Sequence, residues 1–95
     1  MPFNIASYAM LLKIMVACAG PKYAVGEFVH AFGDVHIYNN HFDQVREQLS
    51  RTIRPAPRVE LTGLDGSSNP WDFTHDMVSV SDYHAHPAIA APVSV

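Results

Sequence analysis

The strongest indication of fold and function in this chain is the stretch Gly33-Asp34-Val35-His36-Ile37-Tyr38. Successive side chains of an extended strand point to opposite faces. Asp34, His36 and Tyr38 should therefore lie side by side, while Val35 and Ile37 pack behind them. An imidazole beside a phenol can hold a hydroxyl group of a small ligand by hydrogen bonds. A packed polar face without a ligand is the alternative interpretation.

This stretch ends a longer segment, Val25–Tyr38, whose Val, Phe and Ile content predicts a strand. Gly33 lies within it, and a glycine inside a strand often marks a close approach of another group to the backbone.

An apolar helix is predicted upstream of that strand. Asn4 is expected to be its N-cap, with Phe3 and Tyr8 meeting as a hydrophobic staple. Apolar residues between positions 5 and 19 occupy nearly every face, which predicts a helix buried on most sides. Gly20, followed by a proline, should end it.

One helix and two strands are predicted downstream. A polar surface helix is expected at His41–Arg51, with an inner face of Phe42, Val45 and Leu49. The expected strands are Arg58–Leu61 and Val78–Tyr83. The remaining tail should be extended, because its prolines cannot continue a helix. This order of elements predicts an α+β class.

Length and composition set limits on function. A chain of 95 residues is enough for one domain, and a domain this small is marginally stable alone. Because 48% of the residues are hydrophobic and only 16% are charged, part of the apolar surface is expected to need a partner. A compact small domain with a rich core is the alternative. The net charge of −3 and the scattered Lys and Arg residues argue against a nucleic-acid polymer as partner.

Cysteine usage and hydropathy indicate a cytoplasmic protein. Cys18 is the one cysteine, so no internal disulfide can form, which fits a reducing compartment. Its place in an apolar helix predicts a buried, inert thiol rather than a nucleophile. Residues 5–19 are too few for a membrane span and are interrupted by Lys13, and no secretory pattern precedes them.

A metal site is not expected, although the chain has six histidines. There is no Cys pair and no His-x3-His on a helix, the spacings that zinc sites use. His84 and His86 could chelate on a strand, but Pro87 follows them and no third ligand is evident.

Asn4 has two interpretations. A carboxamide offers one acceptor and two donors, so it can read an edge that presents both, such as O4 and N3–H of uracil. It can equally be a simple helix cap.

Several segments, in this order, resemble the C-terminal portion of thymidylate synthases. They are Pro-Phe-Asn-Ile-Ala-Ser-Tyr-Ala at 2–9, Glu-Phe-Val-His at 27–30, Gly-Asp-Val-His-Ile-Tyr-Asn-Asn-His at 33–41, Gln44 with Gln48–Arg51, Tyr83–Ile89, and Pro-Val-Ser-Val at 92–95. The resemblance covers nearly the whole chain. It implies that residues 1–95 are the C-terminal portion of a thymidylate synthase domain with that family's α+β fold.

The resemblance implies a role for each matching residue. Asn4 would read the uracil ring of dUMP, and His36, Ile37 and Tyr38 would bind its deoxyribose. Ser94 and Val95, in a tail that closes over the site, would bind the folate co-substrate, 5,10-methylenetetrahydrofolate. The product would be dTMP, and the whole enzyme would be a homodimer.

The resemblance also implies that the chemistry needs residues beyond this segment. The family's nucleophilic cysteine and phosphate-binding arginines lie upstream of the region that matches, so no catalytic residue is assigned here and the isolated chain is expected to be inactive. Ser94 stands where the family usually has alanine. Two alternatives remain: a dUMP or dCMP hydroxymethylase of the same family, and a non-catalytic remnant or half-protein that only associates with an N-terminal partner.

Overall fold

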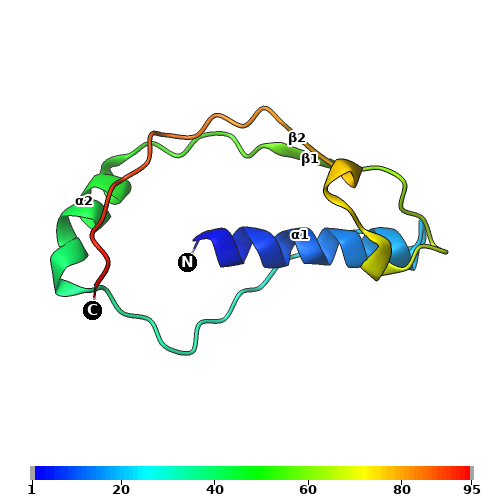
Figure 1. The fold of residues 1–95 in the computed structure, drawn as a ribbon, viewed down its shortest axis with the longest axis horizontal. Helices are drawn as coiled ribbons and strands as arrows, with labels where there is room; N and C mark the ends of the chain where they lie inside the picture. Colours follow the sequence, from blue (N-terminus) through cyan, green and yellow to red (C-terminus); the bar gives the residue numbers. More distant parts are fainter. Residues whose placement is uncertain (1, 95) are drawn as a thin grey trace.

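The computed structural model describes residues 2–94, and Figure 1 shows them as an elongated open ring crossed by one long helix. The long helix is α1 (Pro2–Ala19), and a second helix is α2 (Phe42–Ser50). The strands β1 (Arg58–Leu61) and β2 (Val78–Ser81) form a small antiparallel sheet. Three short 3-10 helices complete the elements: η1 (Asn39–His41), η2 (Pro70–Asp72) and η3 (His75–Met77). The predicted α+β class is confirmed.

Helix α1 begins earlier than the sequence predicts. Its first residue is Pro2, whose fixed φ suits the first turn of a helix. Asn4 therefore lies inside the first turn, and its prediction as an N-cap is wrong. Phe3 and Tyr8 are both largely exposed, so the predicted staple is not formed either. The predicted end is confirmed: Gly20 follows the last helical residue with φ +95°.

The burial of α1 is much less than its apolar sequence predicts. Ile14 and Cys18 are its buried residues, and the rest of its apolar surface is wholly or partly exposed. The buried thiol of Cys18 is as predicted. The expectation that the helix is buried on most sides is wrong for this chain by itself, because the described segments that lie near it bury only Ile14 and Cys18.

Helix α1 also has a length and composition that a membrane span can have. It contains 18 residues with a mean hydropathy of 1.4. The prediction that the segment is too short is therefore wrong, although core helices of soluble proteins share the same profile. Lys13 Nζ donates a hydrogen bond of 3.0 Å to the carbonyl oxygen of Val59, so the middle of the helix is held against β1.

The two predicted short strands are present and pair with each other. Arg58 lies opposite Ser81 and Leu61 opposite Val78, so β1 has the predicted bounds. Strand β2 stops at Ser81 rather than Tyr83, because Asp82 has φ 57° and turns the backbone out of the pairing direction.

The segment predicted as the main strand, Val25–Tyr38, is extended but not paired. Among residues 2–94, the backbone hydrogen bonds outside helices and strands include none from residues 24–37. A strand needs a neighbour to accept its ladder of hydrogen bonds. The described part of the chain supplies no neighbour here, so the prediction of a strand is wrong for this structure.

Helix α2 is close to its prediction, but its apolar face is uncovered. The segment begins with the turn of η1 and then runs as α2 to Ser50. Phe42 and Leu49, expected on an inner face, are 45% and 80% exposed. Val45 is half-buried. No layer of the described residues lies over this face, which explains the difference.

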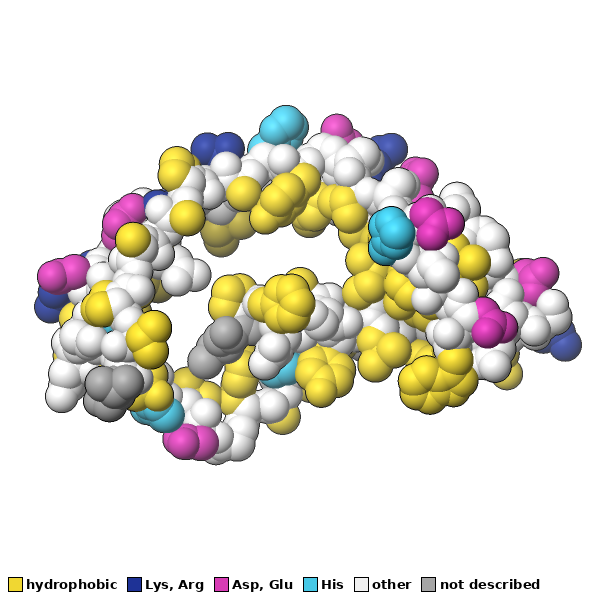
Figure 2. All heavy atoms as spheres, viewed as in Figure 1, with side chains coloured by type: hydrophobic (Ala, Val, Ile, Leu, Met, Phe, Trp, Pro, Cys, Tyr) yellow, Lys and Arg dark blue, Asp and Glu magenta, His cyan; other side chains and the backbone are white. Residues whose placement is uncertain are grey.

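The molecule is larger than a compact domain of its mass. Its radius of gyration is 16.9 Å, against about 12 Å for a compact chain of this length. Its accessible surface is 8033 Å², about 2,600 Å² more than a folded monomer of 10.5 kDa has. Figure 2 shows hydrophobic side chains gathered around the opening beside α1, with charged ones along the outer rim. Apolar surface thus remains available to further protein.

The end of α1 lies close to the loop after β1, and a glycine stands on each side of this contact. An added Cβ at Gly20 would lie 3.1 Å from Gly66 Cα. The loop that presents Gly66 is tightened by Asp65, whose Oδ1 accepts hydrogen bonds from the backbone N–H and hydroxyl of Ser67 at 2.9 and 2.7 Å. Ser68 Oγ adds a third, at 3.2 Å. The Ser67 bonds, followed by that from Ser68, lower the pKa of Asp65 from its ordinary value.

We expect Gly20→Ala to destabilise the folded protein. An alanine at φ +95° is strained by about 1–2 kcal/mol, and its Cβ would also press on Gly66. Gly63→Ala should lower the stability by the backbone strain alone, because Gly63 has φ +74° and only the flexible end of Met77 lies near it. Gly26→Ala should cost least, since nothing lies within 4 Å. Chemical denaturation measures the free energy of unfolding of each variant. Equal values for the three variants would contradict this prediction.

The lowered pKa of Asp65 predicts a dependence of stability on pH. The folded state favours the carboxylate, so the contribution of Asp65 is present above its unfolded pKa and is lost as pH falls through the lower folded pKa. Ser67→Ala should raise the pKa of Asp65 toward its ordinary value. Carboxyl ¹³C NMR titration measures this, with Ser79→Ala in β2 as the matched control. An unchanged Asp65 titration in Ser67→Ala would show that these hydrogen bonds do not set it.

Candidate functional site

The face predicted from strand alternation is present, although the segment is not a strand. The rings of His36 and Tyr38 lie edge to face, with centroids 5.0 Å apart and an angle of 84° between planes. Asp34 Oδ1 lies 3.4 Å from His36 Nδ1. An extended backbone places alternate side chains together even without a pairing strand, which is why this arrangement follows from local sequence.

The backing expected behind this face is missing. Val35 and Ile37 are 60% and 50% exposed, so they pack against little within the described residues. The side chains of His36 and Asp34 are also largely exposed, and an ion pair in such a setting contributes little stability. The Asp34 carboxylate can still orient the imidazole, leaving Nε2 of His36 free to contact a ligand.

The ring of Tyr38 also contacts a second histidine ring. The ring of His41 lies edge to face with Tyr38, with centroids 5.6 Å apart. The backbone N–H of His41 donates to the carbonyl oxygen of Tyr38 at 2.9 Å, which closes the turn into η1. This turn fixes the position of Tyr38 at the start of η1.

Asn4 lies in a different place. It lines a cavity of about 340 Å³ with Tyr8, His30 and Phe32. The His30 ring lies 4.5 Å from Phe32 and 6.4 Å from Tyr8, measured between centroids. The carboxamide therefore faces aromatic side chains rather than a helix terminus. The structure does not bring Asn4 into the cavity that Tyr38 lines.

The tail meets the segment of Tyr38. Tyr38, Asn39, Asn40, Val93 and Ser94 line a second cavity of about 340 Å³. Ser94 Oγ donates a hydrogen bond of 2.6 Å to Asn40 Oδ1. Two predicted site residues that are far apart in the sequence, Tyr38 and Ser94, are thus brought together.

Val95, the other residue predicted to bind folate, lies outside the described residues. Ile37 points away from His36 and Tyr38 by the same alternation that joins them.

Sequence reasoning missed the polar side chains that hold the tail. Gln44 Nε2 donates to the carbonyl oxygen of Ala90 at 3.2 Å, and Arg51 Nη1 donates to that of Pro87 at 2.7 Å. His41 Nε2 lies 2.8 Å from the carbonyl oxygen of Pro92. The signal was the spacing of long polar side chains at 41, 44 and 51, which places them on one side of a helix.

The ring of His86, in the tail, is engaged by the chain itself. His86 Nε2 lies 2.9 Å from the carbonyl oxygen of Thr52, and the Arg54 guanidinium lies against the same ring. No group of three or more His, Cys, Asp or Glu side chains able to hold a metal ion occurs within residues 2–94.

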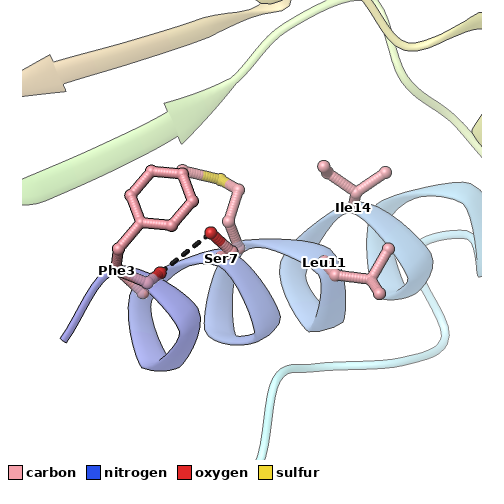
Figure 3. Close-up of a pocket in the computed structure, with 6 residues that line it drawn as sticks. Phe3, Ser7, Leu11 and Ile14 are labelled. Atoms are coloured by element: carbon pink, nitrogen blue, oxygen red, sulfur yellow. Dashed lines mark hydrogen bonds between the residues drawn. The ribbon is translucent and has the colours of Figure 1, made fainter. Parts of the chain in front are cut away.

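Two further hollows lie on α1 and are apolar. One, of about 470 Å³, follows the side of the helix on which Figure 3 shows Phe3, Ser7, Leu11 and Ile14. Ser7 Oγ donates to the carbonyl oxygen of Phe3 at 2.8 Å, so its polar group is already satisfied within the helix. The other, of about 540 Å³, lies between α1 and the sheet, with Met10, Val59 and Val80 among its lining residues. Both suit apolar protein surface better than a polar ligand.

Comparison with known proteins gives a consistent result. The family described as thymidylate synthase matches residues 1–95 of this chain. A protein named thymidylate synthase, from Leuconostoc mesenteroides subsp. mesenteroides, is 50% identical over 94 residues. That match covers 99% of this chain and 28% of the relative, so the chain spans less than a third of the length of the curated relative.

Proposed function

Because this chain belongs to the thymidylate synthase family, we propose that it is the C-terminal part of a cytoplasmic enzyme that methylates dUMP to dTMP. The observation that carries the proposal is the family match over the full chain, together with the paired rings of His36 and Tyr38. We propose 5,10-methylenetetrahydrofolate as the co-substrate; when bound, it supplies the one-carbon unit and the reducing hydride.

We propose that this segment supplies the base- and sugar-reading half of the dUMP site. The Asn4 carboxamide has the donors and the acceptor to pair with O4 and N3–H of uracil. The imidazole of His36 and the phenol of Tyr38, side by side, suit the 3′-hydroxyl of deoxyribose, with Ile37 in the backbone between them. These groups bind and orient the nucleotide; the nucleophile is assigned to a segment upstream.

The separation of Asn4 from Tyr38 sets a condition on this proposal. Both must reach one nucleotide, yet they line different cavities here. The segment between positions 24 and 37 has unsatisfied backbone groups that can pair with strands of the remaining protein. Such pairing would set the distance between this segment and α1, and so between the two halves of the site.

The tail is proposed to bind the folate. The second cavity, at Tyr38 and Ser94, offers an aromatic ring, two amides and a hydroxyl, which fit the mixed donors and acceptors of a pterin. We propose that Ser94 and Val95 contact it and that the tail excludes water from the reacting atoms.

The exposed apolar surface supports a larger assembly. The excess of about 2,600 Å² on this chain is as large as the roughly 1,000–2,500 Å² that each partner of an obligate interface buries. We propose that the rest of the polypeptide and, in a homodimer, a second subunit cover it. Burial against protein also accounts for the apolar sides of α1 without a membrane.

A hybrid enzyme tests the proposed function. Residues 1–95 would replace the matching segment of the Leuconostoc mesenteroides relative, and the purified hybrid would be given dUMP and methylenetetrahydrofolate. We expect dTMP as the product and growth of a thymidine-requiring strain without thymidine. A folded hybrid that forms no dTMP, or that forms a hydroxymethyl nucleotide instead, would overturn the proposal.

The role of Asn4 gives a separate prediction in the same hybrid. Asn4→Asp should lower kcat/KM for dUMP roughly ten- to hundredfold, because an acceptor-only carboxylate opposes O4 of uracil. The preference should move toward dCMP, whose edge presents an amino group. Asn69→Asp is the matched control: Asn69 caps η2 by accepting from the N–H of Trp71, and an aspartate can do the same. If Asn4→Asp keeps the dUMP preference, Asn4 does not read the base.

A further inference from the structure

We propose that one side of the η1–α2 segment positions the folate-binding tail, through side chains that bind its backbone carbonyl groups. The residues are His41, Gln44 and Arg51, which we term the tail-docking face. This proposal rests on the proposed function and adds to it a set of positioning residues that do not touch the nucleotide.

The contacts run in register along both segments. His41, Gln44 and Arg51, in that order along the helix, meet carbonyl oxygens of Pro92, Ala90 and Pro87. The helix and the tail are therefore antiparallel, as Figure 1 also shows. Ten helical residues advance about 15 Å, and five extended residues advance about 16 Å, so the two spacings match over the whole contact.

The chemistry of the two sides is complementary. Pro87 and Pro92 have no backbone N–H, so the tail offers mainly acceptors at these positions. Arg51 is a donor only, and Gln44 uses its amide nitrogen as a donor. Binding to the carbonyl groups of Pro87, Ala90 and Pro92 fixes where the tail lies without using the side chains of these residues.

Arg51 is itself held in place by a neighbour on α2. Glu47 Oε1 accepts from Arg51 Nη2 at 2.6 Å, one turn away on α2, and the Arg51 side chain is 21% exposed. Gln44 is half-buried, and its Oε1 is buried without a hydrogen-bond partner among the described residues. The ion pair therefore constrains Arg51 to point along the tail, whereas Gln44 is directed by its hydrogen bond to Ala90.

The end of the docked tail lies at the candidate site. Beyond the His41 contact, Ser94 Oγ binds Asn40 Oδ1, and both residues line the cavity that Tyr38 shares. The tail-docking face thus sets the distance between Ser94 and Tyr38, the folate-binding and sugar-binding ends of that cavity.

The hybrid enzyme described above tests this role. Arg51→Gln and Gln44→Met should each raise KM for methylenetetrahydrofolate roughly three- to tenfold, because each removes one hydrogen bond to the tail. The Kd for dUMP alone should stay unchanged. Carboxypeptidase should release the residues after Pro92 faster by a similar factor, which reports tail docking independently of catalysis.

A matched control lies on the same helix. Arg46 pairs with Asp43 at 2.6 Å, and its side chain is 74% exposed. Arg46→Gln should leave the folate KM and the release rate unchanged. If the test and control variants alter both quantities equally, or if none does, the positioning role is overturned while dTMP formation stands. If the parent hybrid makes no dTMP but Arg51→Gln still speeds tail release, docking stands and the proposed function fails.

Discussion

The constraint on which the rest of the structure depends is the burial of helix α1. Its sequence is apolar on nearly every side, yet only Ile14 and Cys18 are buried by the described residues. Burial of apolar surface contributes roughly 25 cal/mol per Å², so leaving such a helix uncovered forgoes the largest stabilising term a small domain has. The sheet covers one side through Lys13 and Val59, and the open sides call for more protein.

Local and non-local features were predictable to different degrees. The end of α1 at Gly20, the bounds of β1 and most of α2 follow from propensity and turn chemistry, which act over a few residues. That Val25–Tyr38 stays unpaired did not follow, because strand formation depends on a neighbour, and that neighbour can be distant in sequence. The prediction of Asn4 as the N-cap was wrong for a local reason, because Pro2 allows the helix to begin before Asn4.

The candidate site divides along the same line. The shared face of His36 and Tyr38 was predictable, since alternation needs only an extended backbone. The meeting of Tyr38 with Ser94 was not, because it depends on how the tail crosses α2. The separation of Asn4 from Tyr38 was not predictable either, because it reflects the unpaired segment between them. Residue types thus indicated the chemistry, while long-range contacts decided which residues act together.

The two kinds of contact in this chain suit two kinds of task. The sides of α1 are apolar, and burying them against protein is a permanent change, because exposing them again would cost the full transfer free energy. The tail is held instead by hydrogen bonds, which contribute about 0.5–1.5 kcal/mol each from the neutral side chains and about 1.5–3 kcal/mol from the charged Arg51. Contacts of that strength can open and close during turnover without unfolding the site. A segment that admits a substrate and then covers it, as we propose for this tail, is therefore better held by Gln44 and Arg51 than by apolar packing.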